Sequence, residues 1–196
     1  MILDAGLYLR RRERNRLTRY RLMRRTKKTI EVIKKYKVGK NNLSLLDIGA
    51  ADGAMLSVLR KQFGFKRAIG VEPNMDLIRA KKDSQIKLIN STGESLPFSE
   101  SEFDTVIIAS VIEHVKDGDK LLAESYRVLK KGGLLIMTTV DPFFDKIATF
   151  LGFKPNDHYR TYNLKELKKL FINAGFQIKL TEKFGPLFYE LVVGEK

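Results

Sequence analysis

The chain has 196 residues and no Cys, and its 37 Lys and Arg against 23 Asp and Glu give a net charge of +14. The length fits one domain, with or without an appendage. Without Cys there can be no disulfide, Cys-ligated zinc, iron–sulfur cluster or thiol nucleophile, and no apolar run reaches the ~18 residues of a membrane span. The start lacks a basic stretch followed by an apolar one, so we expect a cytoplasmic protein without a signal peptide.

The basic charge is concentrated at the N-terminus. Residues 1–40 hold 15 Lys and Arg and three acids, whereas residues 41–196 hold 22 Lys and Arg and 20 acids, so this part of the chain is nearly neutral. Residues 8–37 contain no Pro or Gly, and their apolar residues fall at helical spacing. This pattern predicts one or two amphipathic helices. We therefore divide the chain into a basic helical segment, 1–42, which caps or docks, and an α/β domain, 43–196.

Two interpretations of the basic segment stay open. Nine Arg between Arg10 and Arg25 exceed what solubility needs. In the first interpretation, residues 10–40 bind RNA phosphates, an anionic membrane surface or an anionic acceptor. In the second, the apolar face of the helix packs on the sheet and its basic face stays in water.

From residue 43 onward, short apolar runs alternate with helical patterns. Strands are predicted at 45–48, 67–71, 86–89, 103–109 and 134–140. Helices are predicted at 53–63, 74–83, 118–130, closed by Lys130-Lys131-Gly132-Gly133, and 163–174. Residues 176–183 and 187–193 predict a closing antiparallel hairpin. The fold class is thus α/β, a doubly wound, mostly parallel seven-stranded sheet whose ligands lie at the carboxyl ends of the strands.

The loop after the first strand, Asp47 to Ala54, consists mostly of small residues. Small residues let the backbone approach a ligand closely, and the N-terminus of the next helix favours anionic groups. The second strand ends in Glu72, where an acid can accept both hydroxyls of a ribose. Ala51 and Ala54 break the G-x-G-x-x-G fingerprint that a dinucleotide enzyme needs. The alternative to a ligand site is that these loop residues only form tight turns, such as any α/β protein has.

Five motifs, in this order, resemble those of class I S-adenosylmethionine-dependent methyltransferases, in particular the "type 11"-like members that act on small molecules. They are LLDIGAADG (45–53), GVEPN (70–74), ESLPF (94–98), the FD…EHV stretch (103–115) and RVLKKGG (127–133). The resemblance implies the Rossmann-like methyltransferase fold, S-adenosylmethionine as cofactor and S-adenosylhomocysteine as product.

The resemblance also implies the cofactor site. Glu72 would bind the ribose hydroxyls, and Pro73 and Met75 would line the adenine. Thr92 stands where the family has an acid for the adenine amino group, and Ala51 replaces a Gly, which tightens the fit provided that its backbone angles are ordinary. The implied cofactor residues are Asp47, Gly49, Ala50, Ala51, Gly53, Glu72, Pro73, Met75, Thr92, Gly93, Glu94, Ala109, Ser110 and His114.

Methyl transfer is an in-line displacement at a sulfonium methyl, so the enzyme must align the acceptor and exclude water. It needs a base only where the acceptor is weakly acidic. The absence of Cys excludes the usual cytosine-C5 chemistry. Residues 109–112 lack [DN]-P-P-[YF], which disfavours adenine and amide nitrogens. We expect a small acceptor, lipid-linked or anionic.

Acceptor-side residues are expected in the loop after the fifth strand and in the N-terminal helices. Asp141 and Pro142 predict the start of a short helix that has an apolar stripe over 143–151. Three interpretations of this stripe stay open: a lid over the acceptor, a membrane-facing patch, and a face that packs on the edge of the sheet. We expect the third. Residues 157–162 resemble the H-x-R-x-[FY] stretch of small-molecule members, where His158 is a base or, alternatively, part of a helix cap. The catalytic candidates are His158 and Asp141, and the acceptor-binding candidates are Tyr20, Phe143, Phe144, Tyr159 and Arg160.

No metal site is expected, because the two His are isolated and no carboxylate cluster has ligand spacing. Two alternatives to a small-molecule methyltransferase stay open. An RNA methyltransferase would use the basic segment to hold phosphates. A non-catalytic cofactor-binding protein would have the same fold, because fold does not fix function.

Overall fold

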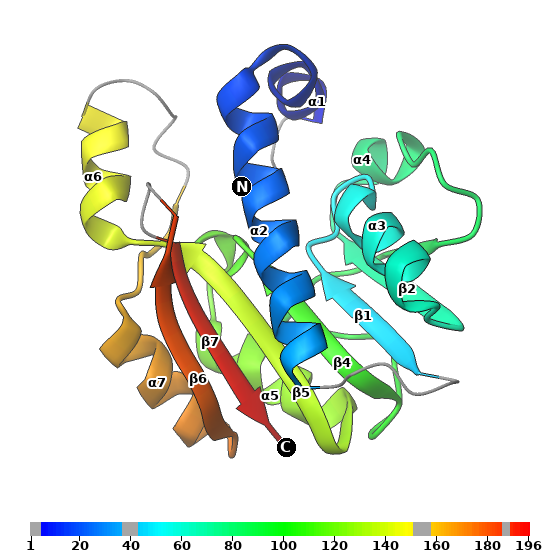
Figure 1. The fold of residues 1–196 in the computed structure, drawn as a ribbon, viewed down its shortest axis with the longest axis vertical. Helices are drawn as coiled ribbons and strands as arrows, with labels where there is room; N and C mark the ends of the chain where they lie inside the picture. The colour runs from blue at the N-terminus through cyan, green and yellow to red at the C-terminus, as the bar shows by residue number, and fades with distance from the viewer. Residues whose placement is uncertain (1–4, 37–42, 151–157, 186–188) are drawn as a thin grey trace.

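The computed structural model describes residues 5–36, 43–150, 158–185 and 189–196 (Figure 1). Its centre is a seven-stranded sheet in the order β3-β2-β1-β4-β5-β7-β6. The strands are β1 (Ser44–Ile48), β2 (Arg67–Glu72), β3 (Lys87–Asn90), β4 (Phe103–Ala109), β5 (Leu129–Val140), β6 (Gln177–Phe184) and β7 (Tyr189–Glu195). The helices are α1 (Ala5–Arg14), α2 (Arg16–Lys35), α3 (Ala54–Phe63), α4 (Met75–Arg79), η1 (Ile112–His114), α5 (Gly118–Val128), α6 (Pro142–Phe150) and α7 (Leu164–Asn173).

The first five strands pair in parallel, and β7 pairs antiparallel with both β5 and β6. This is the mostly parallel sheet with a C-terminal hairpin that the sequence predicts. The chain moves outward from β1 to β3 and then returns to the other side of β1 with β4. Such a reversal leaves a crevice at the carboxyl ends of the two central strands, where ligands of open α/β sheets bind.

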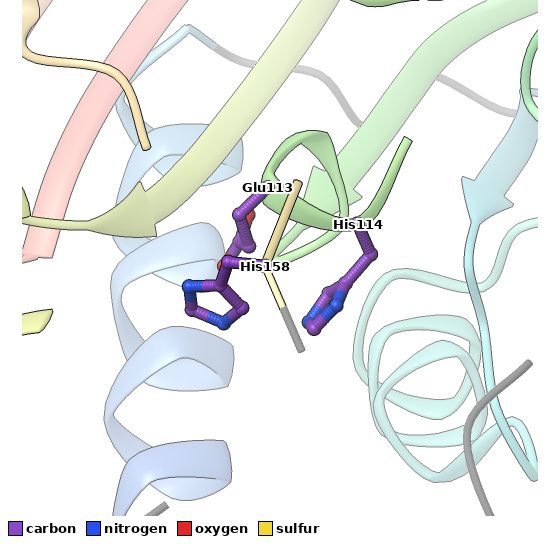
Figure 2. A group of neighbouring side chains, drawn as sticks. All are labelled: Glu113, His114 and His158. Atoms are coloured by element: carbon purple, nitrogen blue, oxygen red, sulfur yellow. The ribbon is translucent and has the colours of Figure 1, made fainter. Parts of the chain in front are cut away.

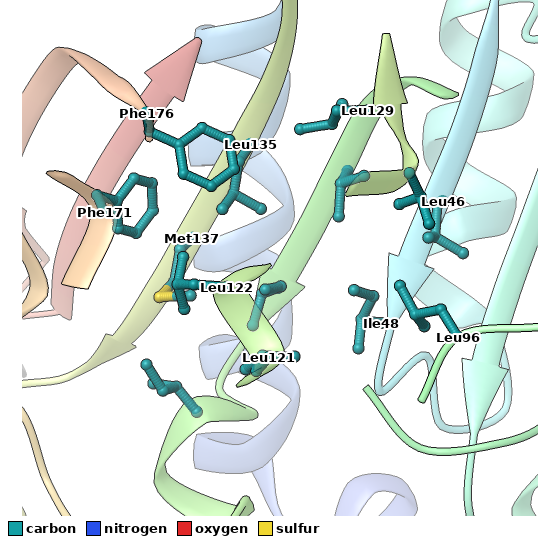
Figure 3. Packing of buried hydrophobic residues seen from close by; sticks show 14 of the residues in the cluster. Leu46, Ile48, Leu96, Leu121, Leu122, Leu129, Leu135, Met137, Phe171 and Phe176 are labelled. Atoms are coloured by element: carbon teal, nitrogen blue, oxygen red, sulfur yellow. The ribbon is translucent and has the colours of Figure 1, made fainter. Parts of the chain in front are cut away.

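The sheet is covered on both faces, and each face has its own hydrophobic core. Leu45 and Leu46 are adjacent in β1 and belong to different cores, because successive side chains of a strand point to opposite faces. One core lies under α5 and α7 and includes Leu121, Leu135 and Phe171 (Figure 3). The other contains residues of α2 and α3. The two packed faces therefore hold the strand ends of the crevice in fixed positions.

Helix α2 is part of the second core. Val32 and Ile33 are buried with residues of β1, β4, β5 and β7, and α2 runs across that face of the sheet in Figure 1. Lys28 pairs with Glu182 of β6 at 2.7 Å. The apolar face of α2 thus packs on the sheet, as the second interpretation expects. The division of the chain between residues 42 and 43 stays a prediction, since residues 37–42 lie outside the described part.

Two predicted helices end earlier than expected. Helix α4 stops at Arg79, because the following residues form a turn in which Lys81 donates to the carbonyl of Ile86 (2.9 Å). Residues 130–133 do not close a helix but lie in β5. There the N–H of Gly132 donates to the carbonyl of Lys196 (2.8 Å). The C-terminus therefore draws this segment into the sheet.

Helix α6 corrects another expectation. The apolar stripe was expected to pack on the sheet edge, but Phe143 is 65% exposed and Phe150 is 90% exposed, with Ile147 also exposed. Leu151 lies outside the described residues. The lid and membrane interpretations of this stripe stay predictions. In the described part of the chain, no helix has both the length and the apolar composition to cross a membrane.

Removing the side chain of Ile33 tests whether α2 is part of the folded core. Because Ile33 is fully buried, Ile33→Ala should lower the free energy of unfolding by about 2–5 kcal/mol. The control Met23→Ala, at an exposed position of the same helix, should change it by less than about 0.5 kcal/mol. Urea unfolding measures both values. Equal stability of the two variants would contradict the docked position of α2.

Candidate active site

A pocket lies at the carboxyl ends of β1 and β4, next to α1 and α2. Five of the predicted cofactor residues line it, namely Asp47, Gly49, Ala50, Ala51 and Ala109. The lining also contains residues that were not predicted to bind the cofactor, namely Tyr8, Leu22, Arg25, Asp52, Ala54 and Met55. The first three come from the N-terminal helices. The sequence of this Arg-rich segment does not indicate which of its Arg residues faces the pocket. The basic segment thus contributes directly to the pocket.

The loop after β1 has an unusual backbone. Gly49, Ala51 and Gly53 all have left-handed φ angles, of 72°, 51° and 77°. The condition of ordinary angles at Ala51 is therefore not met, and this residue carries a strain of about 1–2 kcal/mol. At Gly49 a Cβ would lie 2.3 Å from a methyl of Val111. Only Gly lets the loop after β4 approach this closely.

Glu72 joins the end of β2 to this loop. Its carboxylate accepts the N–H of Ala51 and the N–H of Asn74, each at 3.0 Å. Burial raises the pKa of Glu72 above its ordinary value, although these two backbone donors act in the opposite direction. A carboxylate has further lone pairs, so Glu72 can still accept from a hydroxyl of a ligand. Pro73 and Met75 follow it and are exposed.

A buried acid, Asp47, and a half-buried base, Arg25, meet in the pocket. Asp47 is 1% exposed, and its Oδ1 has no hydrogen-bond partner among the described residues. Burial raises the pKa of Asp47 to about 7, against the lowering effect of the Arg25 charge. Arg25 donates from Nη1 to the carbonyl of Ala109 (3.1 Å), while its buried Nε has no partner in the described part.

These two atoms suit a ligand that carries an ammonium and a carboxylate on one carbon. The free Oδ1 of Asp47 can accept from an ammonium, and the free Nε of Arg25 can donate to a carboxylate. Buried polar atoms without partners are rare and call for an explanation. The pocket therefore fits the amino-acid end of the cofactor that the sequence motifs imply.

The loop after β4 contributes a third strained position. Ser110 has a φ of 57°, and its buried Oγ has no partner among the described residues. Its N–H donates to the carbonyl of Thr138 (2.8 Å), which ties the loop to β5. Strain of this kind is often stored at ligand sites. Ser110 lies beside Ala109 and thus at the rim of the pocket.

The remaining predicted cofactor residues do not line the pocket. Thr92 forms an isolated bridge with Ser95. At Gly93 a Cβ would lie 2.5 Å from Leu121, so this Gly allows close packing. Glu94 accepts the N–H of Lys116 at 3.3 Å. Gly53 packs closely against Ile86 in the same way as Gly93 does against Leu121.

The two His of the chain lie side by side, which contradicts the premise that they are isolated. The ring centroids of His114 and His158 are 4.7 Å apart, and the rings are nearly perpendicular. His158 Nδ1 lies 3.0 Å from a carboxylate oxygen of Asp145. Glu113, which is buried, belongs to the same group (Figure 2). The sequence contains no signal for this group, because packing alone brings η1, α6 and residue 158 together.

Asp141 has two partners. One carboxylate oxygen accepts the N–H of Phe143 (2.9 Å) and begins α6, and the other accepts from Lys183 (2.5 Å). Burial opposes ionisation of Asp141, but the hydrogen bond and charge of Lys183 together with the backbone N–H donors of α6 outweigh it and hold the pKa below its usual value. Burial raises the pKa of the neighbouring Glu190 to about 7. Asp141 is thus an ionised residue whose contacts position α6.

The acceptor-binding candidates are spread over three segments. Tyr20 is exposed on α2, with the guanidinium of Arg24 6.0 Å from its ring centroid. Arg160 pairs with Glu166 at 3.0 Å, so its charge is already matched. The other three candidates are Phe143 and Phe144, whose ring centroids are 5.4 Å apart, and the exposed Tyr159.

Comparison with known proteins yields one consistent family. The model of the methyltransferase domain family matches residues 10–180. Phosphoethanolamine N-methyltransferase 2 of Caenorhabditis elegans is 27% identical over 177 residues, which are 85% of this chain and 40% of that protein. The ubiquinone/menaquinone biosynthesis C-methyltransferase UbiE of Psychromonas ingrahamii is 36% identical over 89 residues, or 45% of this chain and 34% of that protein. The chain thus spans less than half the length of these curated relatives.

Solved structures agree with this family. A SAM-dependent methyltransferase of Thermotoga maritima, described as a possible histamine N-methyltransferase, has a TM-score of 0.68 at 25% identity, covering 84% of this chain and 86% of that one. Phosphoethanolamine N-methyltransferase 2 of Haemonchus contortus, in complex with S-adenosyl-L-methionine, has a TM-score of 0.71 at 18% identity, covering 87% and 52%. The second likeness concerns the fold alone.

The raised pKa of Asp47 predicts a pH dependence of stability. Between the unfolded pKa of 3.8 and the folded pKa of about 7, the folded state binds more protons than the unfolded state. The free energy of unfolding should therefore fall as pH rises through this window, by up to ~1.4 kcal/mol per pH unit. In Asp47→Asn this contribution is lost.

Urea unfolding of both proteins at pH 5.5 and 7.5 measures the effect. Between these two pH values, Asp47→Asn should lose roughly 1–2 kcal/mol less stability than the unchanged chain. Glu190→Gln serves as the matched control, since the pKa of Glu190 lies in the same range. This variant should keep the contribution of Asp47 to the pH dependence of the free energy of unfolding. An identical pH dependence before and after Asp47→Asn would show that Asp47 is ionised throughout.

Proposed function

The chain belongs to the class I S-adenosylmethionine-dependent methyltransferase family, and from this premise we propose that it transfers the methyl group of S-adenosylmethionine to a small-molecule acceptor. The observation that carries the proposal is the pocket at the ends of β1 and β4. Its unpartnered Asp47 and Arg25 atoms match the ammonium and carboxylate of a methionine group.

Four residues hold the cofactor in this proposal. Asp47 accepts from the ammonium, Arg25 donates to the carboxylate and Glu72 accepts from the ribose. The backbone of the loop around Ala51 approaches the ligand. When bound, the cofactor supplies an electrophilic methyl group on a sulfonium. The chain contributes binding, alignment and the exclusion of water, for which α1 and α2 cover the pocket.

We place the acceptor on the side of the pocket where η1, β5 and α6 meet. There His158 is held by Asp145 at 3.0 Å, an arrangement that fixes the orientation of the ring on the acceptor side. Asp141 acts through its contacts with Lys183 and α6. The relatives support a small acceptor, because their names refer to phosphoethanolamine and to quinones. Binding of RNA or of a membrane by residues 10–40 stays a prediction.

Methyl transfer is tested with S-adenosylmethionine that carries a tritiated methyl group. The full chain is incubated with phosphoethanolamine, with a demethylated quinone or with a small-molecule extract, and the organic and aqueous phases are counted. We expect radioactivity in one of these pools that depends on the protein. Binding of S-adenosylhomocysteine without transfer to any pool would favour the non-catalytic alternative. Nuclease-sensitive counts from added RNA would favour the RNA alternative.

The role of Arg25 predicts a selective loss of affinity. Arg25→Met should weaken S-adenosylhomocysteine about tenfold or more, from the loss of a charge-assisted hydrogen bond. Binding of 5′-methylthioadenosine, which lacks the amino-acid group, should stay unchanged. The matched control is Arg19→Met, at an exposed position of the same helix. Calorimetry measures all affinities, and an equal loss for both ligands would contradict the contact with the carboxylate.

A further inference from the structure

We propose that Glu113, His114 and His158 bind one divalent transition-metal ion, with zinc as the test case. The acceptor role that we assign to this ion rests on the proposed function, whereas the metal site itself does not.

The three side chains have the right atoms in reach of one another. Each offers one ligand atom, and these atoms all lie within 4.8 Å of one another. Figure 2 shows Glu113 and His114 on η1, with His158 beside them. Two imidazoles and one carboxylate are a donor set of catalytic zinc sites. Zinc bonds of about 2.0–2.1 Å place ligand atoms roughly 3.3–3.4 Å apart, so small side-chain rotations close the site.

His158 has the support that a metal-binding His needs. Its Nδ1 lies 3.0 Å from Asp145 Oδ2, and the side chains are 10% and 9% exposed. When Nδ1 donates to this carboxylate, Nε2 keeps a lone pair for a metal ion. A carboxylate in this position orients the ring and raises its basicity, as is common in zinc sites. Asp145 is therefore a positioning residue and not a ligand.

Glu113 supplies a buried carboxyl group that no described cation contacts. Its residue is 1% exposed, and its carboxylate accepts from the hydroxyl of Thr139 at 2.9 Å. Within the described residues, no Lys or Arg forms an ion pair with it. Burial of an ionised carboxylate without a cation is costly, and coordination of a metal is one of the ways in which proteins compensate it.

The backbone holds the three residues in place. Glu113 and His114 are neighbours in η1. The N–H of Tyr159 donates to the carbonyl of Glu113 at 2.8 Å, which fixes His158 next to η1. The ring of His114 meets that of His158 edge to face, with centroids 4.7 Å apart. The site is thus assembled by main-chain contacts as well as by side chains.

Three protein ligands leave one coordination position of a tetrahedral ion open. In catalytic sites this position holds water or substrate. A metal ion there binds an oxygen donor and lowers the pKa of a bound hydroxyl. Under the proposed function, this open position is where the ion would hold an oxygen atom of the acceptor.

The test uses the full chain, freed of any affinity tag and of bound metal by chelation. Calorimetric titration with zinc should give one site per chain. The chain has only two His and no Cys, so no thiol competes and imidazole nitrogen NMR contains two ring systems. Both should shift on addition of zinc. Glu113→Gln and His158→Gln should each abolish the single site, and Asp145→Asn should weaken it about 10–100-fold. Asp76→Asn, which changes an exposed acid on α4, should have no effect.

Two results would overturn the metal site. One is the absence of one-to-one binding or of shifts in both His rings. The other is binding that survives both Glu113→Gln and His158→Gln in proteins with native circular dichroism. If Glu113→Gln does not fold, His114→Gln takes its place. Titration of the same samples with S-adenosylhomocysteine, without zinc, tests the cofactor pocket separately. Its failure contradicts the proposed function, whereas failure of zinc binding alone contradicts only this inference.

Discussion

The placement of Arg25 beside the buried Asp47 is the constraint on which the active site depends. Arg25 reaches the carbonyl of Ala109 only because α2 is docked on the sheet through Val32 and Ile33. Buried polar atoms such as Asp47 Oδ1 and Arg25 Nε are costly unless they find partners. The pocket leaves both atoms without a partner in the described residues. Docking of the basic helix and binding of a zwitterionic ligand are therefore linked.

A second charged region lies past the end of β4. Glu113 and the His158–Asp145 pair form one part of it, and Asp141 with Lys183 forms another. It is connected to the cofactor pocket through the strands, since the N–H of Ser110 bonds to β5 and Thr139 of β5 bonds to Glu113. The cofactor pocket and the acceptor side that we propose thus share the ends of two neighbouring strands, which suits a reaction that requires alignment.

The pattern of apolar residues was enough to predict the sheet, its helices and the loop that carries the site. Central parallel strands are buried on both faces, so runs such as 103–109 stand out in the sequence. Predictions were less accurate where distant residues compete with local preference. Residues 130–133 have the composition of a helix end, yet they pair with Lys196 at the other end of the chain. Ala51 takes a left-handed angle because the loop is bound to Glu72.

The sequence by itself determined the fold class, the family motifs and the residues of the loop after β1, because these depend on local spacing along the chain. Only the tertiary structure decided which Arg of the basic segment enters the pocket and that the two His meet. Residues of these pairs are far apart in the chain, and their approach depends on how α2, η1 and α6 pack. Periodicity specifies the face on which a residue lies, whereas packing of separate segments specifies its neighbours.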